Sequence, residues 1–134
     1  MISYCSKQRK VKSTLRTDDE LELLINILVK REQILINGES INKYNRNFDA
    51  MRKHARELIN KNRQEELLPY LESDSVSVRR DVAGLLFHCY PEKCRTVLME
   101  IGEMSVEDGL PKCFINVSLS AKMALEIGIP KDFP

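Results

Sequence analysis

Apolar residues recur at spacings of three and four positions along six successive stretches of the chain. In the first stretch, Leu21, Leu24 and Leu28 fall on one helical face, because an α-helix turns once in about 3.6 residues. No stretch shows the sustained two-residue alternation that a half-buried β-strand needs. The pattern predicts an all-α protein of about three antiparallel helix pairs. The expected helices cover residues 20–37, 41–61, 64–72 and 76–89, with a fifth from 91 and a sixth that ends before 128.

Helix start and stop signals agree with these boundaries. Thr17 and Glu20 have the spacing of a capping box, in which each side chain bonds the backbone N–H of the other residue. Asn37-Gly38 predicts the end of the first helix, because glycine readily adopts the left-handed conformation found there. Asp74-Ser75 supplies cap residues before the fourth helix, and Pro91 suits the first position of the fifth.

The composition is that of one globular domain. The chain has 134 residues, of which 43% are hydrophobic and 31% charged, and this excludes a disordered protein. A net charge of +1 provides no general attraction to nucleic acid or to membranes. We therefore treat residues 1–134 as a single domain, with the polar, basic residues 1–16 as a flexible arm.

The sequence also indicates a compartment. The basic N-terminal residues are not followed by the apolar segment of a signal peptide, and no run approaches the roughly 20 apolar residues that span a bilayer. The four cysteines include no pair separated by two residues. We expect a cytoplasmic protein with reduced thiols, monomeric in its free form and without membrane association.

Residues Leu68–Leu86 resemble a HEAT repeat. The matching positions are Pro69, Leu71, Asp74, Val78, Arg79, Ala83, Leu85 and Leu86. The resemblance implies that Pro69 bends an outer helix and that Ala83-Gly84 permits close helix approach. It also implies that Asp74 caps the inner helix and pairs with Arg79.

The match continues through the segments Pro91-Glu92-Lys93, Val97-Leu98 and Ser120–Glu126. Over residues 64–127 the chain resembles a small bacterial family of HEAT-like domains of unassigned function, often found beside secreted toxins. The resemblance implies a short HEAT-like α-solenoid, whose stacked helix pairs form a concave binding surface. It further implies an immunity protein of the contact-dependent growth inhibition type, which neutralises a toxin by covering its active site.

The side chains that support catalysis do not form a recognisable motif. Nucleophilic catalysis needs a Cys or Ser beside a base that a third group orients, and neither His54 nor His88 stands in such a pattern. The spacing of a zinc site is absent from the set His88, Cys89, Cys94 and Cys113. His88 and Cys89 are adjacent, and adjacent residues of a helix point about 100° apart. We expect a binding protein rather than an enzyme, with no metal, no cofactor and His54 at the surface.

Charge is distributed unevenly between the two halves. Residues 1–67 carry 14 basic and 10 acidic side chains, whereas residues 68–134 carry 7 and 10. The predicted partner-binding face is acidic, suits a basic toxin such as a nuclease, and comprises Glu72, Asp81, Glu100, Glu103, Glu107 and Asp108. The alternative face is basic and comprises Arg46, Lys53, Arg56 and Arg63. The basic face suits an acidic protein; nucleic acid is the weaker prediction, because no aromatic side chains interleave with it. A generic protein-interaction scaffold remains the alternative to toxin immunity.

Overall fold

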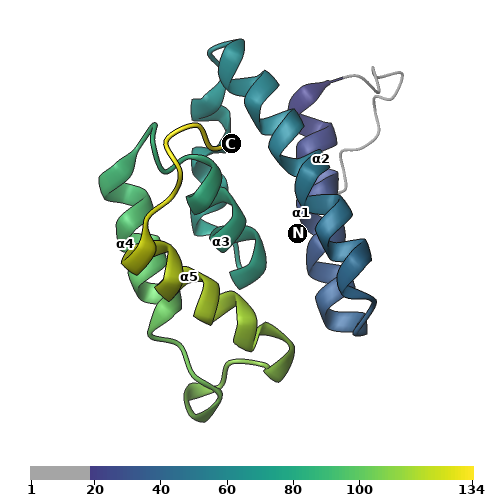
Figure 1. The fold of residues 1–134 in the computed structure, drawn as a ribbon, viewed down its shortest axis with the longest axis vertical. Coiled ribbons are helices and arrows are strands. Elements are labelled where there is room, and N and C mark those ends of the chain that lie inside the picture. Colours follow the sequence, from purple (N-terminus) through teal and green to yellow (C-terminus); the bar gives the residue numbers. More distant parts are fainter. Residues whose placement is uncertain (1–18) are drawn as a thin grey trace.

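The computed structural model describes residues 19–134, and the secondary structure of this range consists of helices joined by loops, with no β-strand (Figure 1). The α-helices are α1 (Glu20–Asn37), α2 (Ile41–Asn60), α3 (Val76–Leu85), α4 (Pro91–Gly102) and α5 (Ile115–Ile127). The 3-10 helices are η2 (Gln64–Glu72), η3 (Val106–Asp108) and η4 (Lys112–Phe114). The all-α prediction is confirmed for this part of the chain, while the predicted arm at residues 1–16 lies outside it. No helix between residues 19 and 134 is long and apolar enough to cross a bilayer.

The start of α1 differs from the predicted capping box. Asp19 is the N-cap, and its side chain accepts a hydrogen bond from the backbone N–H of Leu21 at 3.3 Å. The carboxylate of Glu20 lies against the ring of His54 on α2. Thr17, the other member of the predicted capping box, lies outside the described residues. The N-cap is therefore two residues later than predicted.

The other helix boundaries follow local signals, except that α3 ends at Leu85, before the predicted end at residue 89. Gly38 ends α1 with φ 65°, as predicted, and its N–H donates to carbonyls in the last turn. Ser75 caps α3 by accepting from the N–H of Val78 at 3.1 Å. Asp74 is exposed and forms no ion pair with Arg79, whose Nε is buried without a hydrogen-bond partner among the described residues. The predicted Asp74–Arg79 pair is therefore wrong.

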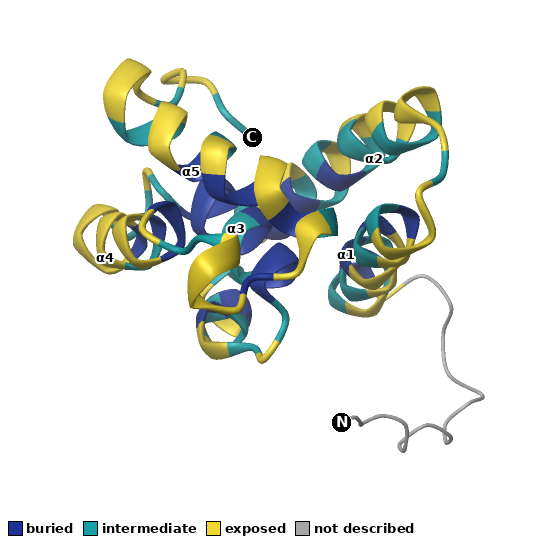
Figure 2. Cartoon of the chain, turned by 90° about the horizontal axis from the view of Figure 1, so that it is seen from below, coloured by how far each residue is buried: buried dark blue, intermediate teal, exposed yellow. Residues whose placement is uncertain are grey.

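The core is organised around α3. Eight of the ten residues of α3 are buried, and it lies between the α1–α2 side and the α4–α5 side of the molecule (Figure 2). It contacts η2, α1, α4 and α5. Fully buried leucines and isoleucines from α1, α2, η2 and α4 pack in the same cluster. Truncating one of them to alanine costs about 2–5 kcal/mol.

Neighbouring helices in the sequence also pack against each other. The contacts join α1 to α2, η2 to α3, α3 to α4 and α4 to α5. The hydroxyl of Ser118 in α5 donates to the carbonyl of Met104 at 3.1 Å, which fixes the connection after α4. Ile41 is apolar but lies at the first position of α2, where it is 68% exposed.

Candidate functional site

A cavity of about 420 Å³ lies between α2, α3, α5 and the segment 128–134, and we call it the central groove. Cavities of about 300–1,000 Å³ with apolar walls and a few polar groups are typical of ligand sites. Its lining includes Arg31, Tyr44, Phe48, Arg80, Asp81, Gly84, Ser120, Met123, Ile127 and Phe133.

A buried ion pair forms part of the wall of the groove. Arg31 Nε lies 2.9 Å from Asp81 Oδ2, and the two side chains are only 3% and 8% exposed. Arg31 also donates from Nη1 to the carbonyl of Tyr44 at 3.0 Å, and its guanidinium lies 4.0 Å from the centre of that ring. These contacts hold Arg31 in one position and neutralise its charge. Asp81 is therefore no part of an exposed acidic face, which corrects its predicted role in partner binding.

The neighbouring Arg80 forms no ion pair with any acid of residues 19–134, although the charge of Asp81 favours its protonated form. Its Nε donates to Ser120 Oγ at 2.8 Å, and that hydroxyl in turn donates to the carbonyl of Val117 at 2.9 Å. Within residues 19–134, no acceptor is bonded to the terminal nitrogens of Arg80. Burial lowers the pKa of the Arg80 guanidinium, although arginine remains protonated at neutral pH. The groove therefore holds a positioned cation whose hydrogen-bonding capacity is only partly used.

Apolar side chains continue from the groove along α5. Its inner side packs in the core through Val117 and Ala121. Four other apolar side chains of α5, spaced four residues apart, are 41–76% exposed to solvent. This row consists of Ile115, Leu119, Met123 and Ile127. Because Met123 and Ile127 also line the groove, the row and the groove form one continuous surface. We call this row the α5 apolar row.

The segment 128–134 crosses from α5 back towards α2 (Figure 1). The Phe133 ring lies 5.9 Å from that of Phe48, and the Arg52 guanidinium lies 5.1 Å from the centre of Phe133. Arg56 Nε donates to the carbonyl of Pro134 at 2.8 Å. His88 Nε2 lies 2.8 Å from the carbonyl oxygen of Pro130. These contacts hold the segment as one edge of the groove.

The structure separates the residues of the predicted acidic face. Glu72 and Glu100 come together and line an open hollow of about 910 Å³ between η2 and α4. Glu103 and Glu107 are exposed at the end of α4 and in η3. Asp108, also in η3, accepts a hydrogen bond from Ser105 at 2.9 Å.

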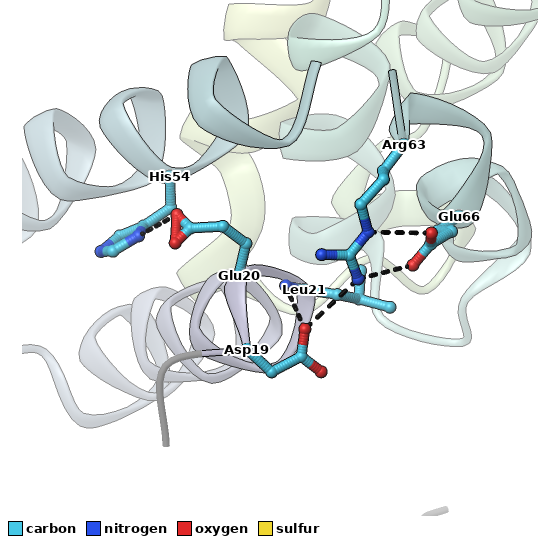
Figure 3. Close-up of polar contacts among 6 residues, drawn as sticks. All are labelled: Asp19, Glu20, Leu21, His54, Arg63 and Glu66. Atoms are coloured by element: carbon cyan, nitrogen blue, oxygen red, sulfur yellow. Dashed lines mark hydrogen bonds and ion pairs between the residues drawn. The ribbon is translucent and has the colours of Figure 1, made fainter. Parts of the chain in front are cut away.

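The predicted basic face is also divided. Arg46 and Lys53 are exposed on α2, whereas Arg56 is bonded to the segment 128–134. Arg63 lies beyond α2 and pairs with Glu66 at 2.9 Å and with Asp19 at 3.3 Å (Figure 3). The hydrogen bonds that Arg63 donates to these carboxylates raise the pKa of its guanidinium. The predicted place of Arg63 in the basic face is corrected, because its guanidinium is already paired with Glu66, three residues on, and with Asp19 at the start of α1.

His54 is half-buried, which corrects its predicted place at the surface. Its Nδ1 lies 3.0 Å from Glu20 Oε2, which comes from the start of α1 (Figure 3). Glu57 lies one turn further along α2, and the ligand atoms of the three residues are all within 4.8 Å of one another. Carboxylates and an imidazole are acceptable ligands for a divalent cation. The hydrogen bond between His54 and Glu20 joins α2 to the start of α1 here.

The described cysteines do not form a site. Cys89, Cys94 and Cys113 are free thiols, and Cys5 lies outside the described residues. Cys94 is fully buried, and burial raises the pKa of its thiol to about 12. A thiol in this environment is unreactive at neutral pH, because the thiolate is the nucleophile.

Comparison with known proteins establishes a structural likeness. No family model matches the chain, and no curated protein matches it. The crystal structure of the protein RPA1889 from Rhodopseudomonas palustris CGA009 is similar, with a TM-score of 0.65 and 25% sequence identity. The similarity covers 84% of this chain and 88% of that one. A solved protein therefore adopts a similar arrangement of helices over most of its length.

The sequence interpretation missed the arginines of the groove. Arg31 stands three residues after Leu28 and three before Ile34, on the buried face of α1. A charged residue on an apolar face is a signal that a buried partner exists. Nothing in the local pattern identifies that partner as Asp81, and Arg80 and Ser120 meet only because α3 and α5 pack together.

Proposed function

We propose that this chain is a non-enzymatic binding protein that receives another protein on the α5 apolar row and in the adjoining central groove. The observation that carries the proposal is the exposure of four apolar side chains at helical spacing beside a concave, partly charged surface. Contiguous exposed apolar surface with a polar surround is typical of protein interaction sites. A partner that covered the row would remove these side chains from water.

We also propose that the helices of this all-α protein stack as a short HEAT-like solenoid. It is supported by the contacts of α1 with α2, η2 with α3 and α4 with α5, and by the central place of α3. It is also supported by the resemblance of residues 64–127 to HEAT-like repeats. In such a stack, the helices α2, α3 and α5 would line the inner side, where the groove lies.

The biological setting that we propose is toxin immunity. Its support is the resemblance of residues 64–127 to HEAT-like domains found beside secreted toxins. An inhibitor that acts by covering an active site needs a complementary surface and no catalytic groups of its own. A generic interaction scaffold would use the same surface, and therefore the setting has to be tested in cells.

Substitutions on α5 test the binding surface. The partner is first isolated with the wild-type chain and purified, and its affinity is then measured for Met123→Asp and Ile127→Asp. Each change places a charge in the apolar row, and we expect affinity to fall at least about tenfold, which corresponds to about 1.4 kcal/mol.

Met99→Asp is the matched control, because Met99 on α4 is 49% exposed and Met123 is 54% exposed. The control should retain wild-type affinity, and all variants should keep the helical circular dichroism of the wild type. Equal losses in the control and the α5 variants, or no loss in either α5 variant, would refute the assignment of the surface.

A growth-rescue experiment tests the setting. The gene is expressed in cells that produce the toxin encoded beside it, with Met123→Asp as the binding-deficient variant. Toxin immunity predicts that the wild type restores growth and that the variant does not. If the wild type binds its partner but restores no growth against that toxin, the scaffold alternative is favoured.

A further inference from the structure

The charges around the central groove do not balance. Two arginines, Arg31 and Arg80, line it together with Asp81, which is the only acidic residue that the described part of the chain contributes to its lining. The Asp81 carboxylate already accepts from Arg31 at 2.9 Å. Arg80 is therefore left as an excess positive charge, in a setting where burial makes an unpaired charge costly.

The position of Arg80 is fixed by its neighbours. The hydrogen bond from its Nε to Ser120 Oγ, 2.8 Å long, holds one edge of the guanidinium. Gly84 lies one turn further along α3, and a Cβ atom there would stand only 2.8 Å from Arg80 Nη1. The absence of a side chain at Gly84 thus makes the room in which the terminal nitrogens lie. A planar guanidinium held in this way offers its remaining N–H groups in a fixed fork.

Apolar side chains line the groove together with these polar groups. Phe48, Met123 and Phe133 line the same cavity of about 420 Å³. An anion that reached Arg80 would lose water and would bring its uncharged part against these side chains. Charge-assisted hydrogen bonds from arginine to carboxylate are roughly twice as strong as neutral ones, and the fork matches a carboxylate in both spacing and plane.

We propose that the central groove is a carboxylate-binding site, in which the terminal nitrogens of Arg80 hold an acidic side chain of the protein partner. The stem of that side chain lies against Met123 and Phe48. That the carboxylate belongs to a protein partner rests on the proposed function. That the groove binds a carboxylate rests on the residues of the groove alone. Ser120 and Gly84 are positioning residues that act through Arg80.

A small-molecule titration tests the site without the partner. Isovalerate carries a carboxylate on a short apolar body, and isovaleramide is its neutral counterpart of nearly equal shape. Binding is followed by NMR, through the Nε–H resonance of Arg80 and the backbone amide of Gly84. We expect saturable shifts with isovalerate, and affinity at least about tenfold weaker for isovaleramide.

Variants on the same helix supply the controls. Arg80→Gln should remove the response of the Gly84 amide to isovalerate. Gly84→Ala should weaken isovalerate binding at least about tenfold, because the added Cβ displaces Nη1 of Arg80. Arg79→Gln should change nothing, since Arg79 lines the hollow between η2 and α4 instead.

Several results would overturn the carboxylate site. They are the absence of saturable shifts with isovalerate, an equal response to isovaleramide, and undiminished binding by Arg80→Gln. Tighter binding of inorganic phosphate than of isovalerate would also overturn it, because the groove would then select a different anion.

The purified partner separates this inference from the proposed function. If Met123→Asp abolishes partner binding while Arg80→Gln leaves it unchanged, the surface assignment stands and the carboxylate site fails. Both the binding surface and the carboxylate site are supported if each variant lowers the affinity for the partner at least about tenfold and the loss caused by Arg80→Gln becomes smaller at high salt.

Discussion

Removal of Arg31 from its buried ion pair should be among the most destabilising single substitutions in this protein. Arg31→Met keeps the length of the side chain but leaves the carboxylate of Asp81, which is 8% exposed, without its partner. It also removes the hydrogen bond to the carbonyl of Tyr44 and the contact with the Tyr44 ring. Breaking a buried pair in this way costs about 3–5 kcal/mol, because an uncompensated charge remains in the interior.

The assay is urea unfolding followed by circular dichroism. For a slope of about 2 kcal/mol per molar urea, the expected loss moves the unfolding midpoint down by roughly 1.5–2.5 M. Asp81→Leu should cost a similar amount, since it leaves Arg31 buried and unpaired. The double variant Arg31→Met/Asp81→Leu should recover most of the stability, because replacing both ions of a buried pair by apolar groups is often neutral or stabilising.

Arg63→Met is the matched control. Arg63 also pairs with two carboxylates, but its side chain is 32% exposed and its partners are more exposed still. Ion pairs at such sites contribute about 0–1 kcal/mol. The reasoning is refuted if Arg31→Met costs no more than Arg63→Met, or if the double variant loses as much as the two single variants added together.

Three further changes probe the local structure. Ser75→Ala should destabilise by about 1 kcal/mol through loss of the α3 cap, whereas Asp74→Ala should have little effect; equal urea midpoints for the two variants would contradict the cap assignment. Gly38→Ala should cost about 1–2 kcal/mol, because its φ of 65° is unfavourable for any residue with a Cβ, and an unchanged melting temperature would argue against it. At about pH 8, a thiol reagent should modify half-buried Cys113 in the native protein but Cys94 only after unfolding, since burial raises the pKa of Cys94 to about 12; equal rates of modification would disprove this.

Much of the helical structure was predictable from short-range patterns. The end of α1 at Gly38, the range 64–72 of η2 and the start of α4 at Pro91 all agree with the sequence interpretation. Helix boundaries depend on residues within about four positions of one another, because backbone hydrogen bonds and caps close over that distance. Periodicity also identifies the face of each helix that is buried, as it does for Leu24 and Leu28.

The candidate site could not be predicted in the same way. Asp81 and Arg63 were interpreted as surface charges, whereas Asp81 lies against Arg31, 50 positions away, and Arg63 against Asp19, 44 positions away. Arg80 meets Ser120 across 40 positions. The sequence by itself determined which residues are helical and which faces are apolar, because these properties depend on near neighbours. Only the tertiary structure decided which charges are neutralised and which one stays available in the groove. That outcome depends on the rotation and approach of whole helices, and a periodic pattern specifies each face only relative to its own helix axis.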